Sequence, residues 1–214
     1  MRINKYVALA TGLSRRSADK AMAEGRVSVN SQVVPLGYEV KANEVIKLDG
    51  KVIELRKKIT VLLNKPVGYV CSRNGQCSPT IYDLLPAELT NLKPVGRLDK
   101  DSSGLLLLTN DGELAQKLTH PSYNKEKKYQ VVLDKSLKPE DKHKIEGGIK
   151  LKDGLSSLKL SGQGTKWTVT IHEGRNRQIR RTFEALEYRV VKLNRTDFGQ
   201  YSIHNIGIAN YTIL

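Results

Sequence analysis

The sequence predicts an α+β protein in two parts, a small αα-β domain over residues 1–57 and a larger domain over residues 58–214. The larger part is expected to contain a mixed, mainly antiparallel sheet with flanking helices. Three observations predict this class. Two short helical patterns open the chain, strand-like segments separated by turns fill most of the remainder, and two further helical patterns interrupt those strands.

The segment 3–25 is predicted to form two short helices. Ile3 and Val7 fall on one face of the first helix. Ser14 is placed to cap the second helix, and Gly25 is placed to end it.

A small sheet is predicted to follow these helices. Residues 26–34 alternate apolar and polar side chains about Asn30-Ser31, which indicates a hairpin. Another strand over 45–48 ends at the turn Asp49-Gly50, and the basic run 56–58 is typical of a linker.

In the second part the strands and helices are predicted from periodicity. Strands are expected over 61–63, 105–108, 127–133 and 167–171, and the second of these is wholly apolar, as in a central strand. A helix is expected after Asn110-Asp111-Gly112, with Glu113 supporting its start. Another is expected from Asn176, with Ile179, Phe183 and Leu186 as its buried face.

The charge balance points to a polyanionic partner. The chain has 36 Lys and Arg against 22 Asp and Glu, a net charge of +14. Charge alone leaves RNA, DNA and anionic membranes open. Because no stretch is long and apolar enough for a signal peptide or a membrane span, we expect no membrane association and a cytoplasmic location.

The cysteines and histidines predict no metal site. Cys71 and Cys77 are the only cysteines, and no second pair and no His-x-x-x-His spacing completes a zinc site. Two reduced thiols in a cytoplasmic protein are therefore expected.

Basic side chains are concentrated in the helical part of the first domain. They are Arg2, Lys5, Arg15, Arg16, Lys20 and Arg26. Such a cluster on two adjacent helices predicts a phosphate-binding face. Together with Ser14-Arg15-Arg16 and Gly25-Arg26-Val27-x-Val29-Asn30, it resembles the S4 RNA-binding domain.

The densest chemical signal is the segment 96–104, directly before the apolar strand. Asp99 and Asp101 stand among Arg97 and Lys100. A carboxylate beside an arginine stays ionised, and in a dry pocket it becomes a competent nucleophile. An exposed, salt-bridged turn explains the same composition.

The segment Gly96-Arg97-Leu98-Asp99-x-Asp101-Ser102-x-Gly104, with the following strand and Asn110-Asp111-Gly112, closely resembles the signature of the RsuA/RluB group of ribosomal pseudouridine synthases. Three companion motifs stand in the order that this group has. They are Lys65-Pro66-x-Gly68, then His120-Pro121 with Glu126-Lys127-Lys128-Tyr129, then Glu173-Gly174-Arg175-Asn176-Arg177-Gln178-Ile179-Arg180-Arg181. With the S4-like part, the resemblance covers almost the whole chain. It implies a pseudouridine-synthase-type sheet.

The resemblance implies a reaction and its nucleophile. Asp99 matches the essential aspartate, which attacks a target nucleoside after the base leaves the RNA stack. Attack on the sugar C1′ and attack on the base both stay open. The N-glycosidic bond breaks, the uracil rotates while held, and a C–C bond forms, so no cofactor is expected.

Further roles follow for the matching residues. Arg97 matches a residue that helps to extrude the base, and the alternative is that it only keeps Asp99 ionised. Tyr129 matches the tyrosine that stacks on the flipped base, and Arg180 matches the arginine paired with the catalytic carboxylate. Lys65 is expected to contact RNA or a loop rather than to act as an acid or base. RNA contacts are expected from Arg175, Arg177 and Arg181.

The segment Ser78 to Pro86 is closer to the RluB branch, which modifies large-subunit rRNA, than to the RsuA branch. Thr182 departs from the group, which has an apolar residue there. The expected partner is ribosomal RNA or an assembling ribosomal subunit, bound by a monomer.

Two other functions would account for part of this sequence. One is a non-catalytic RNA-binding protein, which the intact set of Asp99, Tyr129 and Arg180 disfavours. The other is a glycosidase with Asp99 and Asp101 as its carboxylate pair, but alternate positions seldom flank a substrate from two sides.

Overall fold

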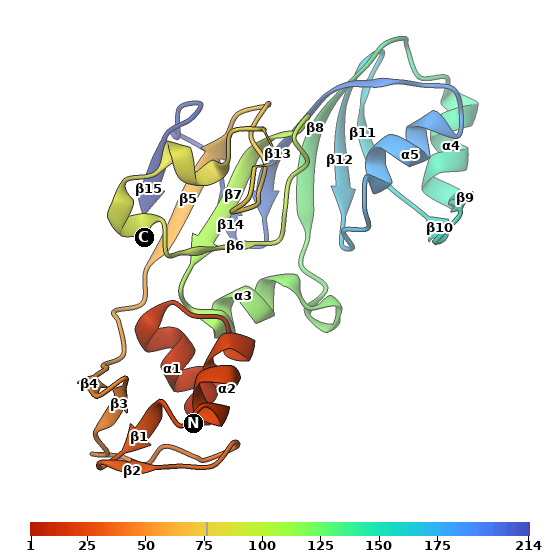
Figure 1. The fold of residues 1–214 in the computed structure, drawn as a ribbon. Helices are drawn as coiled ribbons and strands as arrows, with labels where there is room; N and C mark the ends of the chain where they lie inside the picture. Colours follow the sequence, from red (N-terminus) through yellow and green to blue (C-terminus); the bar gives the residue numbers. More distant parts are fainter. Residues whose placement is uncertain (76) are drawn as a thin grey trace. The chain divides into compact units, whose positions relative to one another are not determined.

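A computed structural model describes residues 1–75 and 77–214. They form two compact units, Met1–Ile59 and Thr60–Leu214 (Figure 1). The sequence placed this division at residues 57 and 58.

The first unit contains two helices, α1 (Ile3–Thr11) and α2 (Arg15–Ala23), and a small antiparallel sheet. The strands of that sheet, in the order β2-β1-β3-β4, are β1 (Val27–Val29), β2 (Gln32–Val33), β3 (Ile46–Leu48) and β4 (Lys51–Val52). Its core is formed by apolar side chains of both helices and of β1 and β3, including Ile3, Val7, Met22, Val27 and Ile46.

Local sequence signals set the boundaries of these elements. The Ser14 hydroxyl accepts a hydrogen bond of 3.0 Å from the Ser17 amide and caps α2. Asn30 and Ser31 both have positive φ, 47° and 68°, which is the geometry of a two-residue hairpin turn between β1 and β2. The predicted helix pair and hairpin are confirmed.

The second unit is built on a large mixed sheet with the order β11-β12-β8-β13-β7-β5-β15, to which β14 adds beside β13 and β6 beside β7. Its strands are β5 (Thr60–Lys65), β6 (Lys93–Val95), β7 (Ser103–Thr109), β8 (Lys127–Leu133), β11 (Lys159–Gln163), β12 (Lys166–Ile171), β13 (Val190–Phe198), β14 (Tyr201–Ser202) and β15 (Tyr211–Ile213). The pairing of β7 with β13 is parallel and the other pairings are antiparallel. The predicted α+β class is confirmed.

Helices flank this sheet, and α4, α5 and a two-stranded hairpin gather beside β11 and β12 (Figure 1). The α-helices are α3 (Gly112–Thr119), α4 (Pro139–Gly147) and α5 (Gln178–Glu184), and the hairpin strands are β9 (Ile149–Leu151) and β10 (Gly154–Ser156). The 3-10 turns are η1 (Ile81–Leu84), η2 (Ala87–Leu89) and η3 (Pro121–Tyr123). No helix in the described ranges is long and apolar enough to cross a membrane.

Burial agrees with the apolar patterns except at one end of α5. The side chains of Leu105 to Leu108 on β7 are all fully buried, as expected for a central strand. Ile179 and Phe183 are buried as predicted, but α5 ends at Glu184. Leu186 therefore lies beyond the helix, where it is half-buried in the turn that leads to β13.

Gly104 allows β7 and β13 to approach each other closely. Its φ is +107°, and a Cβ atom there would lie 2.2 Å from the Arg195 carbonyl oxygen and 2.6 Å from the Arg195 nitrogen. Only glycine fits this contact without moving a strand. Gly104 thus sets the distance between β7, the strand after the aspartate loop, and β13.

Candidate active site

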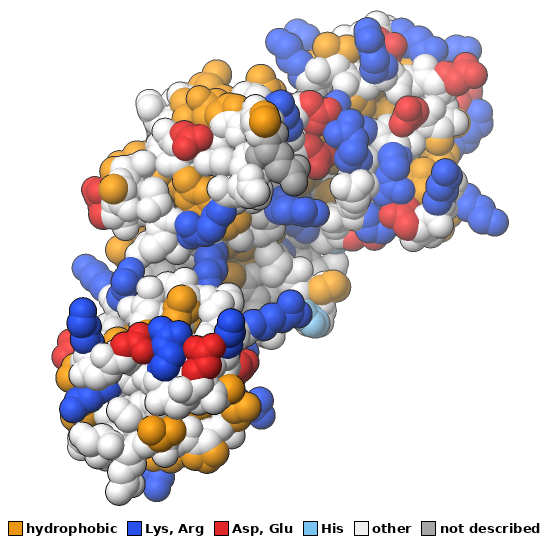
Figure 2. Space-filling view, viewed as in Figure 1, with side chains coloured by type: hydrophobic (Ala, Val, Ile, Leu, Met, Phe, Trp, Pro, Cys, Tyr) orange, Lys and Arg blue, Asp and Glu red, His pale blue; other side chains and the backbone are white. Residues whose placement is uncertain are grey.

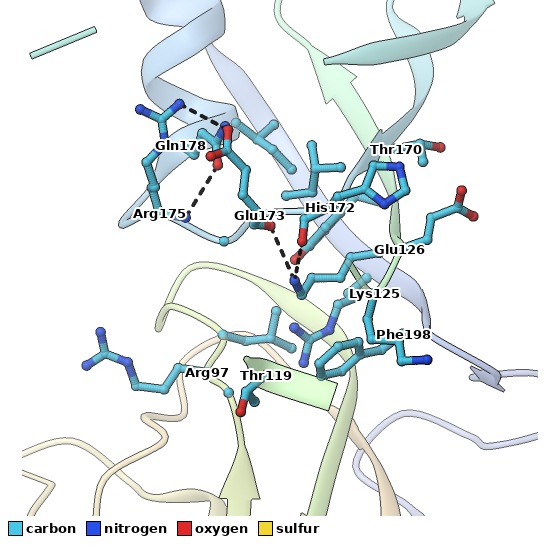
Figure 3. Close-up of a pocket in the computed structure, with 18 of the residues that line it drawn as sticks. Arg97, Thr119, Lys125, Glu126, Thr170, His172, Glu173, Arg175, Gln178 and Phe198 are labelled. Atoms are coloured by element: carbon cyan, nitrogen blue, oxygen red, sulfur yellow. Dashed lines mark hydrogen bonds and ion pairs between the residues drawn. The ribbon is translucent and has the colours of Figure 1, made fainter. Parts of the chain in front are cut away.

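A pocket of about 1100 Å³ opens beside the aspartate loop in the second unit. Its wall is formed by the segment 96–102, the start of β8, the loop 172–177 and the end of β13. Figure 3 places Arg97 and Thr119 on one side of this pocket and Glu173 and Gln178 on the other. Both sides carry polar groups, which can fix the orientation of a bound ligand.

Asp99 lines this pocket from a turn directly before β7. Its carbonyl accepts a hydrogen bond of 3.1 Å from the Ser102 amide, which closes the turn. The carboxylate is 35% exposed, and its Oδ2 lies 3.7 Å from Nη1 of Arg177. Asp99 thus lies beside a cation and is still open to the pocket, as a nucleophile must be.

Asp101 has a different environment. Arg177 donates to both of its carboxylate oxygens at 3.1 Å, and Nε of Arg180 lies 3.2 Å from Oδ2. Burial alone would raise the pKa of Asp101, but the Arg177 hydrogen bonds and the charges of both arginines hold it below its usual value. A carboxyl group with a lowered pKa is a poor general acid, which argues against a glycosidase pair.

The resemblance assigned Arg180 to the catalytic carboxylate, and in this structure it pairs with Asp101 instead. Its Nη2 donates to the Asp101 carbonyl at 2.8 Å, and its Nη1 donates to the Val190 carbonyl at 2.8 Å. Burial lowers the pKa of Arg180 from its usual value. The cation next to Asp99 is Arg177, which precedes α5 in a left-handed conformation with φ 48°. Arg180 is therefore an ion-pair partner of Asp101 here, and its pairing with the catalytic carboxylate stays a prediction.

Tyr129 and Arg97 both line the pocket, at different depths. Tyr129 lies on β8, is 7% exposed, and pairs with Val169 on β12 and Arg195 on β13. Arg97 is exposed at the opposite side, and within residues 1–75 and 77–214 it forms no ion pair with Asp99. The alternative role of Arg97, keeping Asp99 ionised, thus has no support in this geometry.

Of the two contacts expected for Lys65, with RNA or with a loop, the structure shows the loop contact, and the burial of the side chain contradicts an RNA contact. The side chain has 0% exposure at the end of β5. Its Nζ donates to the carbonyl oxygens of Pro66 at 3.0 Å, Asp99 at 3.1 Å and Ser102 at 2.7 Å. Burial lowers the pKa of Lys65. Lys65 therefore fixes both ends of the Asp99 turn.

Several arginines that were expected to bind RNA are already paired with carboxylates. Arg181 donates to both oxygens of Asp153 at 2.9 and 2.7 Å, and Arg175 contacts Asp153 and Glu173. Arg26 donates to both oxygens of Asp49, which raises its pKa. Ion pairs of this kind on a surface exchange readily, so they do not prevent phosphate contacts.

The remaining cations of the first unit are more accessible. Arg2, Arg15, Arg16 and Lys20 are exposed, and Lys5 is half-buried. Lys20 lies 3.8 Å from Glu24 at a helical spacing of four residues. On the face seen in Figure 2, Lys and Arg side chains are spread over the surface with Asp and Glu beside several of them.

A buried polar network anchors α5 and explains Thr182, which departs from the group pattern. Thr182 is fully buried, donates to the Gln178 carbonyl at 2.9 Å and shares a hydrogen bond of 2.8 Å with Ser156. Gln178 in turn donates to Ser156 and to Glu173. The hydroxyl of Thr182 is thus satisfied within this network.

Three residues of the pocket wall were not found from the sequence as site residues: Lys127, Arg195 and Phe198. Each lies in an alternating strand, where such residues are usually ordinary sheet positions. Tertiary contacts alone distinguish them. Within residues 1–75 and 77–214, no three His, Cys, Asp or Glu side chains are grouped to hold a metal ion.

The chain is similar to known proteins over its whole length. Residues 59–185 match the RNA pseudouridylate synthase family, and residues 1–46 match the S4 domain. The Bacillus subtilis protein named ribosomal large subunit pseudouridine synthase B is 38% identical, over 96% of this chain and 88% of that protein. The Escherichia coli dual-specificity RNA pseudouridine synthase RluF is 33% identical, over 99% of this chain and 74% of that protein.

A solved structure has the same fold. A crystal structure of a pseudouridylate synthase superposes with a TM-score of 0.72 at 31% identity, covering 100% of this chain and 96% of that one. The family match spans the Asp99 turn, Tyr129 and the loop 172–177, which all line the pocket. The chain therefore belongs to the RNA pseudouridylate synthase family, enzymes that isomerise uridine to pseudouridine in RNA, and it carries an N-terminal S4 domain.

Proposed function

We propose that this enzyme isomerises a uridine of large-subunit ribosomal RNA to pseudouridine, with Asp99 as the nucleophile. The observation that carries the proposal is the contrast between two aspartates of one turn. Asp101 is held by two arginines, whereas Asp99 is open to a pocket that Tyr129 also lines. The target class is supported by similarity to the large-subunit enzyme of Bacillus subtilis.

The chemistry assigns a task to each group. Asp99 attacks the flipped nucleoside, at the sugar C1′ or at the base, and the N1–C1′ bond breaks. The uracil turns while Tyr129 stacks on it and C5 bonds to C1′. The bond between Asp99 and the nucleoside breaks, which regenerates the carboxylate, while C5 loses a proton and N1 gains one. Arg97, at the pocket rim, occupies the space that the base vacates in the RNA. Arg177 places a positive charge beside Asp99, and Arg180 holds the Asp101 end of the turn.

Because the reaction is an isomerisation that moves no net electrons, no cofactor is required. The enzyme should stay active in EDTA, provided that the RNA remains folded in monovalent salt. Loss of activity that only added Zn²⁺ restores, with the RNA structure intact, would contradict this part of the proposal.

RNA contacts are assigned to exposed and half-buried cations of both units. In the S4 domain these are Arg2, Lys5, Arg15, Arg16, Lys20 and Arg26, and in the catalytic unit Arg175, Arg177 and Arg181. Since one chain supplies every group used here, we propose a monomer that acts in the cytoplasm on ribosomal RNA or an assembling subunit.

The test is a map of pseudouridines in rRNA from cells with and without this protein. One large-subunit position should lose its modification in the deletion strain. The wild-type gene should restore it and an Asp99→Asn gene should not. Loss of a small-subunit or tRNA position instead would overturn the assigned target.

A further inference from the structure

A buried guanidinium in the pocket wall is not used by the chemistry above. Arg195 on β13 is 2% exposed and pairs with Gly104 on β7 and with Tyr129 on β8. Its Nε donates to the carbonyl of Leu105 at 2.7 Å. Because this bond and the Gly104 contact fix both its backbone and its side chain, the position of the guanidinium is set by the centre of the sheet.

Part of this guanidinium has no protein partner. Its Nη2 is buried and, within the described part of the chain, donates no hydrogen bond and pairs with no carboxylate. The guanidinium carbon lies 4.9 Å from the centre of the Phe198 ring. A buried charge without a counter-ion is costly, so such groups are kept where a ligand completes them.

A second cation shares the same aromatic ring. Nζ of Lys127 lies 5.3 Å from the centre of Phe198 and donates to the carbonyls of His172 at 3.2 Å and Glu173 at 3.3 Å. Burial lowers the pKa of Lys127, and the positive charge of Arg195 lowers it further, while the Glu173 carboxylate acts in the opposite sense.

The Glu173 carboxylate does not neutralise this pair. It is bound by Arg175 and by the Gln178 amide, and Figure 3 shows both of these side chains directed to it at one side of the pocket. Lys127 and Arg195 thus both lie close to the Phe198 ring. The other carboxylates of the pocket wall are Asp99, which pairs with Arg177, and Glu126, which pairs with Lys128. Among the described residues, none forms an ion pair with Arg195 or Lys127.

We propose that Arg195 and Lys127 form a subsite for the backbone phosphate of the nucleotide whose base enters the pocket. This inference rests on the proposed function and names a further ligand contact for it. RNA carries one phosphate per nucleotide, and a guanidinium with a free Nη2 matches a phosphate oxygen. A uracil carbonyl would satisfy the hydrogen bond, but it would leave both positive charges unbalanced.

The position of Arg195 gives the subsite a role. Tyr129 lies directly across the strand ladder from Arg195, so a base on Tyr129 and its own phosphate on Arg195 would be held by adjacent strands. Fixing the phosphate would hold the ribose while the freed uracil turns. Arg195 and Lys127 are therefore positioning residues, and Asp99 remains the catalytic one.

The experiment changes the RNA and leaves the protein intact. A short rRNA fragment containing the mapped uridine is made with a neutral methylphosphonate in place of the 5′ or the 3′ phosphate of that uridine. Wild-type enzyme should lose about 10- to 100-fold in single-turnover kcat/KM with one of the two substrates. A methylphosphonate four nucleotides away is the control and should have little effect.

Protein variants then assign the contact. Lys127→Met and Arg195→Met should each lower the rate on native RNA, and neither should be slowed further by the sensitive methylphosphonate. Lys192→Met is the matched control, because Lys192 is exposed on the same strand outside the pocket. If Arg195→Met fails to fold by circular dichroism, Lys127→Met and the RNA substitution still test the subsite. The subsite would be overturned if the sensitive methylphosphonate slowed Lys127→Met and Arg195→Met by the same factor as wild type. It would also be overturned if neither methylphosphonate slowed the wild-type enzyme.

A binding measurement separates this inference from the proposed function. Asp99→Asn protein should bind uridine 5′-monophosphate or 3′-monophosphate at least about 10-fold more tightly than uridine in low-salt calorimetry, and Lys127→Met should remove that difference. If wild-type enzyme modifies no rRNA but this preference holds, only the proposed function fails. If rRNA is modified but the preference is absent, only the phosphate subsite fails.

Discussion

Arg177 binds Asp101 with both of its terminal nitrogens, each 3.1 Å from a carboxylate oxygen. This contact joins the loop before α5 to the turn before β7, 76 residues apart in the sequence. The same Nη1 lies 3.7 Å from Asp99 Oδ2. One guanidinium therefore contacts both carboxylates, and it is closer to Asp101 than to Asp99. The two aspartates of the turn are thereby separated into one structural and one reactive group.

The first prediction follows from this separation. Asp99→Asn preserves the shape of the turn but removes the nucleophile, so pseudouridine formation should fall below detection while RNA binding remains. Asp101→Asn should keep measurable turnover, lowered by about 10- to 100-fold through weaker positioning of Arg177 and Arg180. Single-turnover assays with RNA binding measured in parallel check both variants. Turnover by Asp99→Asn would show that the nucleophile is another group.

The second prediction concerns acid stability. The pKa of Asp101 is lower in the folded protein than its unfolded value near 3.9. The ionised group therefore stabilises the fold above about pH 4, and this contribution is lost as pH falls through the lowered folded value. Asp101→Asn should consequently be less stable than wild type at pH 7 and show a smaller further loss on acidification. Urea unfolding at several pH values measures this, and parallel curves for both proteins would contradict it.

The third prediction tests the approach of β7 to β13. In Gly104→Ala the new methyl group would meet the Arg195 backbone at 2.2 Å, and the residue would keep a φ of +107° that alanine disfavours. The free energy of unfolding should fall by about 3 kcal/mol or more. Gly112→Ala is the control, because its Cβ would meet nothing within 4 Å, and it should change stability by less than about 1 kcal/mol. Similar unfolding midpoints for the two variants would refute the steric argument.

The fourth prediction assigns RNA affinity to the S4 domain. Deleting residues 1–57 should weaken rRNA binding and raise KM more than it lowers kcat, since the pocket lies entirely within Thr60–Leu214. If the domain makes about three phosphate contacts, the slope of log K against log salt should shrink by roughly 2 to 3. Circular dichroism must first show that the fragment is folded. A folded fragment with unchanged affinity and salt slope would exclude this domain as the RNA anchor.

Local patterns determined most of the secondary structure. The Ser14 cap, the Asn30-Ser31 turn and the apolar run Leu105 to Leu108 each act through neighbours in the sequence, so their effect is visible in the sequence itself. The apolar periodicity predicts Leu186 on the buried face of α5, but the helix ends at Glu184. Periodicity alone cannot mark this end, because the apolar pattern continues past the turn that tertiary packing imposes.

The sequence by itself determined the α+β class, the family and the segment that carries Asp99, because motif order and strand period are properties of the chain. The tertiary structure decided which side chains share an environment. It buried Lys65 beneath the Asp99 turn, gave Asp101 to Arg177 and Arg180, and left Nη2 of Arg195 unpaired in the pocket wall. Ion pairing and burial depend on distances between residues far apart in the sequence, and only the packed sheet sets those distances.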